Sequence, residues 1–356
     1  MPPTTSAPTS LPTTAPSTGP AARLAEAASD VAAATAPAGG GSIVEMYPLL
    51  GGVWLGWALG ANDASNVFGT AVASRMVRFR TAVMLSSVFV LAGALVGGAA
   101  GMKTLSGLAE QSLRSALVVT AAAAAIVTLM TALKLPVSTS QGVVGAILGM
   151  GLATDPAGVR WGLLVKVVLA WVSAPIGAAV VAMVLYPLLG RLLDAMRLSL
   201  VRRSQVLKAA LIVSGSYGAY ALGANNVANV VGVFYGSAPF GEDAGLWALL
   251  GGGAIMLGIV TFSRRVMFTV GRSLVQLDAF SALVAVLSQA TTVLVLAYVG
   301  VPVSTSTAIV GGVLGIGMVK GVRTINLPTL LRILSGWVST PLLAGLAAFA
   351  LARLLL

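Results

Sequence analysis

Three short motifs occur twice in this chain, in the same order and at nearly the same spacing. They read Gly-Ala-Asn-(Asp or Asn), Pro-Val-Ser-Thr-Ser and Trp-Val-Ser-(Ala or Thr)-Pro. Their copies begin at residues 60 and 223, 136 and 302, and 171 and 337, with offsets of 163, 166 and 166 residues. Motifs repeated in one order at one spacing indicate an internal duplication. The chain is therefore predicted to fold as two related halves.

Apolar runs fill nearly all of the chain after residue 42. Only 9% of the 356 residues are charged and 57% are hydrophobic, whereas about 25% of the residues of a soluble domain are charged. The runs lie at 43–72, 81–101, 115–133, 137–153, 161–189, 208–236, 245–262, 279–299, 303–319 and 329–355. A spanning helix needs about 20 apolar residues. The composition predicts an all-α polytopic membrane protein with about five transmembrane or half-transmembrane helices in each half.

The predicted organisation has four parts. Residues 1–42 are rich in Pro, Thr, Ser and Ala and lack an apolar run long enough for a signal peptide, so we expect a disordered tail. Residues 43–190 form the first transmembrane repeat and residues 208–356 the second. A basic cytoplasmic linker, 191–207, joins them.

The charges predict an orientation in the membrane. If all ten segments cross, every basic cluster falls on one side and the acidic pair Glu242–Asp243 on the other. The clusters contain Arg75, Arg78, Arg80, Arg191, Arg197, Arg202, Arg203, Lys208, Arg264, Arg265, Arg272, Lys320 and Arg323. The basic side should be cytoplasmic, which places both termini outside the plasma (inner) membrane and explains the net charge of +11 without nucleic acid. The first segments of the two halves then run in opposite directions, so the repeats are inverted.

The first motif places polar residues inside apolar segments. Asp63 is the only acidic residue in the interior of any predicted segment, and a charge there costs at least ~2.5 kcal/mol, which indicates a cation or proton site. Because Asn, Asp and Gly disfavour helix continuation, we expect broken helices at 60–66 and 223–229, lining a site at the bilayer midplane. The asparagines offer amide groups to an ion, although interhelical hydrogen bonding alone also explains such residues.

The second motif predicts two helix N-termini inside the membrane. Its Ser and Thr hydroxyls can cap free backbone N–H groups, and a helix N-terminus also favours an anion; capping alone is the alternative. The predicted substrate-binding residues are Asn62, Asp63, Ser138, Thr139, Ser140, Asn225, Asn226, Ser304, Thr305 and Ser306. The predicted cation-coupling residues are Asp63, Asn66, Asn226 and Asn229. Cation-coupled uptake of a tetrahedral anion is the resulting hypothesis.

At these residues the chain resembles the inorganic phosphate transporter family of the PiT type, which includes phosphate–sodium and phosphate–proton symporters. The family signature is intact from Gly60 to Gly69, the Pro-Val-Ser-Thr-Ser phrase occurs twice, and the resemblance covers about 43–356. It implies import of inorganic phosphate with a co-transported cation, no cofactor, and a homodimer. Asn226 departs from the family by replacing the acid that pairs with Asp63. This favours coupling to a proton or to a single sodium ion near Asp63.

Several alternatives remain. A sulfate permease of the same fold is the closest, because sulfate has nearly the same shape as phosphate. A passive anion channel needs a continuous polar pore, whereas inverted repeats with broken helices favour alternating access. The chain contains no His and no Cys. With one membrane aspartate it offers no acid–base pair or activated nucleophile, so we do not expect an enzyme.

Overall fold

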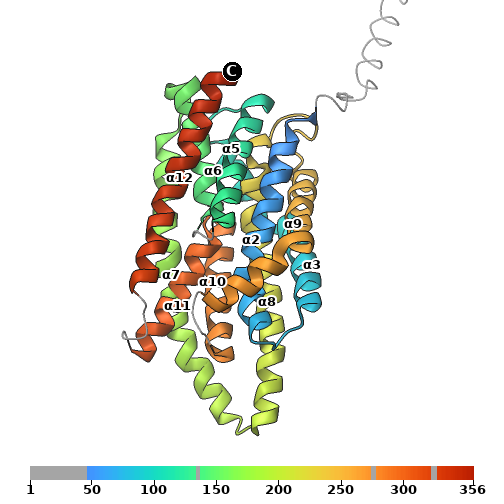
Figure 1. Cartoon of the computed structure of the whole chain (residues 1–356), viewed down its shortest axis with the longest axis vertical. Coiled ribbons are helices and arrows are strands. Elements are labelled where there is room, and N and C mark those ends of the chain that lie inside the picture. The colour runs from blue at the N-terminus through green and yellow to red at the C-terminus, as the bar shows by residue number, and fades with distance from the viewer. Residues whose placement is uncertain (1–45, 134–136, 274–277, 322–326) are drawn as a thin grey trace, which may run out of the picture. The chain divides into compact units, whose positions relative to one another are not determined.

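The computed structural model describes residues 46–133, 137–273, 278–321 and 327–356, and these ranges are helical (Figure 1). The α-helices are α2 (Leu49–Ala73), α3 (Phe79–Gly97), α4 (Ala99–Ser106), α5 (Leu113–Ala132), α6 (Thr139–Thr154), α7 (Trp161–Ala195), α8 (Leu200–Val231), α9 (Ala244–Ser273), α10 (Ala279–Tyr298), α11 (Thr305–Lys320) and α12 (Leu327–Leu355). Two 3₁₀ turns follow α6 and α8, at Pro156–Gly158 and Gly232–Phe234. Each predicted segment contains a helix, and α4 is additional. The predicted tail, 1–42, lies outside the described residues.

Seven helices of the described ranges are long and apolar enough to cross a membrane. The 25-residue α2 is not among them, and it carries Asn62, Asp63 and Asn66. Helices α6 and α11 have 16 residues each, which corresponds to about 24 Å. Since the hydrocarbon core is about 30 Å thick, neither of these two helices spans it alone.

The expected helix breaks at the two signatures are wrong. Helix α2 continues through Asp63 and α8 continues through Asn226. Asn and Asp disfavour helices when their side chains compete for nearby backbone groups. Here most of these side chains bond to partners on other elements, so the helical hydrogen bonds remain intact. The backbone is irregular instead at residues 301–304 and 137–138, directly before α11 and α6.

The predicted linker is also shorter than expected. Helix α7 extends to Ala195 and α8 begins at Leu200, so only residues 196–199 separate the two helices. The basic residues of this region are exposed, and Arg203 forms a surface ion pair with Asp194 at 3.3 Å. Most of the predicted linker therefore consists of polar residues at the end of α7 and the beginning of α8, where both helices continue beyond their apolar parts.

Helices of each half pack against helices of the other half. Helix α2 of the first half packs on α9 of the second, and α8 packs on α3. Gly60 and Gly223 make these approaches close, because a Cβ at either position would overlap with a backbone carbonyl oxygen, that of Ile255 or that of Val90. The same exchange joins α6 to α12 and α11 to α7. At Gly60 and Gly223 the glycines allow close packing between the halves, and, contrary to the prediction, they do not break the helices.

Two helical hairpins meet inside the bundle. Helices α5 and α6 occupy the upper half in Figure 1, and α10 and α11 occupy the lower half. Their tips touch, since Ser140 Oγ at the start of α6 donates to the carbonyl oxygen of Val303, just before α11, at 2.9 Å. The two Ser/Thr phrases are thereby brought to one place.

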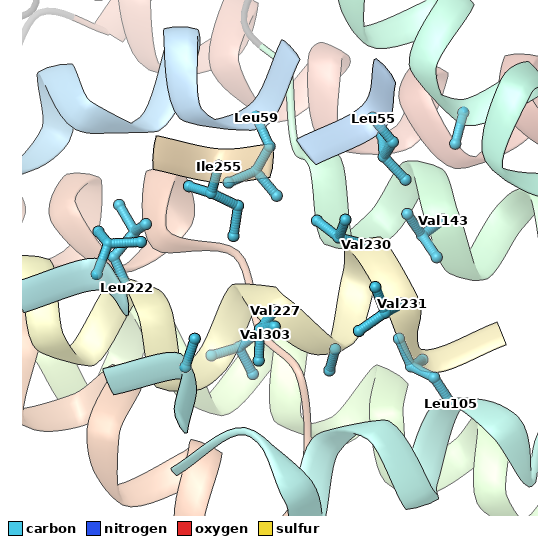
Figure 2. Close-up of a cluster of buried hydrophobic side chains, with 14 of the residues drawn as sticks. Leu55, Leu59, Leu105, Val143, Leu222, Val227, Val230, Val231, Ile255 and Val303 are labelled. Carbon is cyan, nitrogen blue, oxygen red and sulfur yellow. The ribbon is translucent and has the colours of Figure 1, made fainter. Parts of the chain in front are cut away.

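Apolar packing holds α2 and α8 around this place (Figure 2). Leu55 and Leu59 of α2 lie in one buried cluster with Val227 and Val230 of α8 and Ile255 of α9. By contrast, α7 and α12 expose many large apolar side chains. Exposed apolar faces on helices of this length are typical of contact with lipid.

Candidate functional site

Asp63 is the hub of a buried hydrogen-bond cluster. Its carboxylate accepts from Asn226 Nδ2 of α8 at 3.0 Å and from Thr305 Oγ1 of α11 at 2.9 Å, both at Oδ2. Asn62 Nδ2 donates to the other oxygen at 2.9 Å. Only 4% of Asp63 is exposed. A buried carboxylate is stabilised by such donors, and here they come from both halves of the chain.

Two Asn–Ser pairs connect each signature to the Ser/Thr phrase of the other half. Asn229 Nδ2 donates to Ser140 Oγ at 2.8 Å, and Asn66 Nδ2 donates to Ser306 Oγ at 3.2 Å. These pairs are equivalent under the duplication. The predicted asparagines and serines therefore lie together across the interface between the halves.

Asn225 holds the tip of one hairpin. It accepts from the backbone N–H of Val303 at 2.9 Å and donates to the carbonyl oxygen of the same residue at 2.7 Å. Its Nδ2 also donates to Asn226 Oδ1 at 2.6 Å. Asn62 makes the equivalent bond to Asp63, but within the described ranges it makes no bond to Val137, the equivalent of Val303, so the cluster is not symmetric. The irregular backbone before α11 is thereby satisfied by a side chain, as burial requires.

The two phrases also start their helices as predicted. Ser138 is the N-cap of α6 and accepts from the backbone N–H of Gln141 at 3.4 Å, while Ser304 caps α11 through Thr307 at 3.2 Å. Both caps are buried. Two positive helix ends therefore lie at the cluster, where they favour negative charge.

Polar atoms at the start of α6, and one of α8 beside it, have no partner. Thr139 Oγ1, Gln141 Oε1 and Asn229 Oδ1 are buried and make no hydrogen bond within the described ranges. The equivalent of Thr139, Thr305, is bonded to Asp63. Buried polar groups normally have partners, so the unpaired atoms mark the α6 end of the cluster as the place for a polar ligand. Sequence reasoning missed Gln141, although it directly follows the first Ser/Thr phrase.

The cluster contains one formal charge. The ion pairs of the described residues, Arg203–Asp194 and Lys320–Asp278, involve exposed side chains outside it. No group of three or more His, Cys, Asp or Glu side chains lies within reach of one metal ion in the described ranges. The cluster therefore offers amides, hydroxyls, helix ends and one carboxylate. An anion next to Asp63 needs a cation or proton to offset the repulsion.

The structure brings the predicted site residues together. Asn62, Asp63, Ser140, Asn225, Asn226, Thr305 and Asn229 belong to one hydrogen-bonded network. Ser138 and Ser304 join it as helix caps, Asn66 and Ser306 bond to each other, and Thr139 is unpaired. The roles assigned to these residues stay predictions.

Comparisons with known proteins agree with this architecture. The chain is 30% identical to a Methanocaldococcus jannaschii protein named "Putative phosphate permease", over 85% of this chain and 95% of that protein. It is 29% identical to the sulfate permease CysP of Bacillus subtilis, over 88% of each. A solved structure, the sodium-dependent phosphate transporter, matches with a TM-score of 0.77 and 25% identity over 87% of this chain and 98% of that one. The model of the phosphate transporter family matches residues 59–348, and the chain belongs to that family.

Proposed function

We propose that this integral membrane protein imports inorganic phosphate together with a cation by alternating access. The observation that carries the proposal is the meeting of both signatures and both Ser/Thr phrases in one buried cluster around Asp63. Membership of the phosphate transporter family supports phosphate as the substrate. The protein is a transporter and carries out no covalent chemistry on its substrate.

We infer that the halves are inverted repeats. The exchanged packing of α2 with α9 and of α8 with α3 supports this inference. Since the hairpin tips meet at Ser140 and Val303, each hairpin enters from one side and turns back. Three crossings then remain in each half, α2, α3 and α7 in the first and α8, α9 and α12 in the second. Because three is an odd number, the halves have opposite orientations, as ten crossings also implied.

The anion is proposed to bind at the start of α6. Thr139 Oγ1 is an unpaired hydroxyl there that can donate to the anion, next to free backbone N–H groups at a helix N-terminus. The unpaired Gln141 Oε1 can accept from a protonated phosphate oxygen. The start of α11 is engaged by Asp63 and Asn225 and is less free to bind. The two related helix starts therefore differ in this conformation, and alternating access requires related sites that differ in each conformation of a carrier.

Asp63 is proposed to couple transport to one cation. Asn226 replaces the second carboxylate of the duplicated signature and donates to Asp63 instead. One carboxylate suits one proton or one sodium ion. The name of the matching solved structure, a sodium-dependent phosphate transporter, favours sodium. The homodimer implied by the family stays a prediction.

Sulfate is the second candidate substrate, because a named sulfate permease is about as similar to this chain as the phosphate permease. Phosphate can carry a proton, and Asp63 can accept a hydrogen bond from it, as can the unpaired Gln141 Oε1 and Asn229 Oδ1. Sulfate is fully ionised at neutral pH and offers acceptors only. The two anions therefore place different demands on Asp63.

The test is uptake of labelled phosphate into proteoliposomes under separate proton and sodium gradients, with sulfate as competitor. We expect phosphate uptake driven by one cation and little inhibition by sulfate. Asp63→Asn should abolish the gradient-driven uptake while the protein remains folded, because Asn already occupies the equivalent position 226 of α8. Sulfate uptake with phosphate ignored would reassign the substrate. Full uptake by the Asp63 variant would remove its coupling role.

A further inference from the structure

Helix α10 has a buried polar face that the central cluster does not use. Ser288 and Gln289 are fully buried and Thr292 is 9% exposed. Both amide atoms of Gln289 and Oγ1 of Thr292 make no hydrogen bond within the described ranges. Ser288 Oγ donates to the carbonyl oxygen of Ala285 in its own helix at 2.9 Å. An amide with neither end paired is unfavourable in a protein interior.

The fold does not require this polar face. At the offset of 166 residues that relates the Ser/Thr phrases, the equivalents of these three residues are Ala122, Ala123 and Ile126 of α5. Helix α5 builds the equivalent hairpin with an apolar face, and Ala122 and Ala123 are buried. Polar residues at these three positions of α10 are therefore not a requirement of the hairpin fold.

The face lies along the middle of α10, where the helix contacts α8 and α7. One turn before Gln289, Val286 lies at Gly218 of α8, where an added Cβ would be 3.3 Å from Val286 Cγ1. One turn after it, Thr292 lies beside Gly177 of α7, where an added Cβ would be 3.1 Å from Thr292 Cγ2. Gln289 thus lies near the middle of α10, between the Lys320–Asp278 pair at the base of the hairpin and the tip held by Asn225.

The chemistry of the face favours an oxyanion over a cation. Gln289 and Thr292 supply N–H and O–H donors, and no carboxylate belongs to the face. The hairpin opens toward the end of the bundle that carries the exposed arginines of the α7–α8 connection, where the potential favours anions. A tetrahedral oxyanion can accept from the amide and the hydroxyl at once.

We propose that Gln289 and Thr292 form a second oxyanion site, through which the substrate passes between the central cluster and the basic end of the protein. The proposal rests on the proposed function and adds a residue set to it. The site holds the anion by neutral donors alone, so the anion binds weakly enough to leave. Release toward the basic side is the step that it serves.

The test uses Gln289→Leu and Thr292→Val in the full chain, with Gln111→Leu as the matched control. Gln111 also has both amide atoms buried without a partner among the described residues, but it precedes α5 at the other end of the bundle. Phosphate-for-phosphate exchange is measured in right-side-out and inside-out vesicles. Phosphate is varied on one face at a time, and thermal unfolding is measured in parallel.

Loss of one to two donors should raise the half-saturating phosphate concentration on the basic side of the membrane by about tenfold. The half-saturating concentration on the opposite side should change by no more than about twofold. The control Gln111→Leu should not change the half-saturating phosphate concentration on either side of the membrane. The melting temperature of Gln289→Leu should not fall, because no hydrogen bond is lost. Equal effects on both faces, or none, would overturn the second site. If the wild type exchanges sulfate but not phosphate, the proposed substrate fails, and the same comparison with sulfate still tests the site.

Discussion

At the scale of single residues, the start of α6 separates the hydroxyls that hold the fold from those that are free for a ligand. Ser138 caps the helix, whereas Thr139 Oγ1 is buried and unpaired. Ser138→Ala should therefore lower the stability by about 1 kcal/mol, the usual cost of a lost N-cap, and also weaken phosphate binding. Thr139→Val keeps the shape and removes only the free hydroxyl, so it should weaken binding without lowering the melting temperature.

Thermal unfolding and phosphate titration of the two variants check this difference. Ser304→Ala is the matched variant of α11, which has the same cap through Thr307. Because the duplication places both caps at one cluster, we expect it to reduce phosphate affinity as well. Equal loss of stability in Thr139→Val and Ser138→Ala would show that the Thr139 hydroxyl is structural.

The duplication made most site residues predictable, because a polar residue that recurs at a fixed offset is recognisable in an apolar run. The residues that sequence reasoning missed, Gln141 and Gln289, have no polar amide partner in the other half: their equivalents are Thr307 and Ala123. A single glutamine in a helical run looks like any other polar residue. Only its burial without a hydrogen-bond partner distinguishes it.

At the scale of helices, the predicted breaks in α2 and α8 failed for a general reason. Helix propensity describes competition between a side chain and its own backbone. The side chains of Asp63, Asn226 and Asn229 find donors and acceptors on other elements, which no local pattern reveals. The ten apolar segments were predictable, since they depend only on apolar length, whereas α4 and the polar extensions of α7, α8 and α9 were not. The partners of each segment were not.

The exchanged helix contacts predict which glycines are replaceable. Gly60→Ala and Gly223→Ala would press a methyl group against a backbone carbonyl that cannot move away. We expect each to lower stability by at least about 1–3 kcal/mol, the usual cost of overpacking. Gly253→Ala in α9 is the control, because a Cβ there meets nothing within 4 Å. Size-exclusion profiles after heating would rank the variants; equal stability of Gly60→Ala and Gly253→Ala would contradict the close packing.

The ion pair at the base of the α10–α11 hairpin predicts a dependence on pH. Partial burial alone would raise the pKa of Asp278, but hydrogen bonds from Lys320 and Ser281 outweigh it and lower the pKa from 3.8 to about 2. A lowered pKa means that the stabilisation is complete above pH 3.8 and is lost as the pH falls through about 2. Both side chains are at least one-third exposed, so it amounts to about 1 kcal/mol or less.

Thermal unfolding of the wild type and of Lys320→Met, at about pH 7 and about pH 2, checks this dependence. We expect the wild type to melt higher than Lys320→Met at neutral pH, and the difference between the two melting temperatures to shrink to a small fraction at about pH 2. Lys320 also lies over the ring of Tyr186 on α7, at 5.4 Å from its centroid. A difference of the same size at both pH values would assign the stabilisation to this contact instead of to the ion pair.

At the scale of the whole molecule, the positions of the two hairpins decide how the chain crosses the membrane. Two topologies are possible: ten crossings, or six crossings with two hairpins that do not cross. Both topologies put each exposed connection on the same side of the membrane as the other topology does, because a hairpin and a double crossing both return the chain to the side where it started. The two topologies differ only at the hairpin tips. In the first, the tip before α6 lies at the cytoplasmic surface; in the second, it lies at the midplane.

The absence of Cys from the chain makes this difference directly measurable, since a single introduced cysteine is the only thiol. We expect Arg202→Cys, before the apolar part of α8, to react with an impermeant thiol reagent only from the cytoplasmic side. Glu242→Cys should react only from outside, because it is exposed in the connection before α9. Val137→Cys, 6% exposed at the tip before α6, should react from neither side in the conformation described. Rapid cytoplasmic labelling at 137 would restore the ten-crossing topology, and reversal of the other two would invert the protein in the membrane.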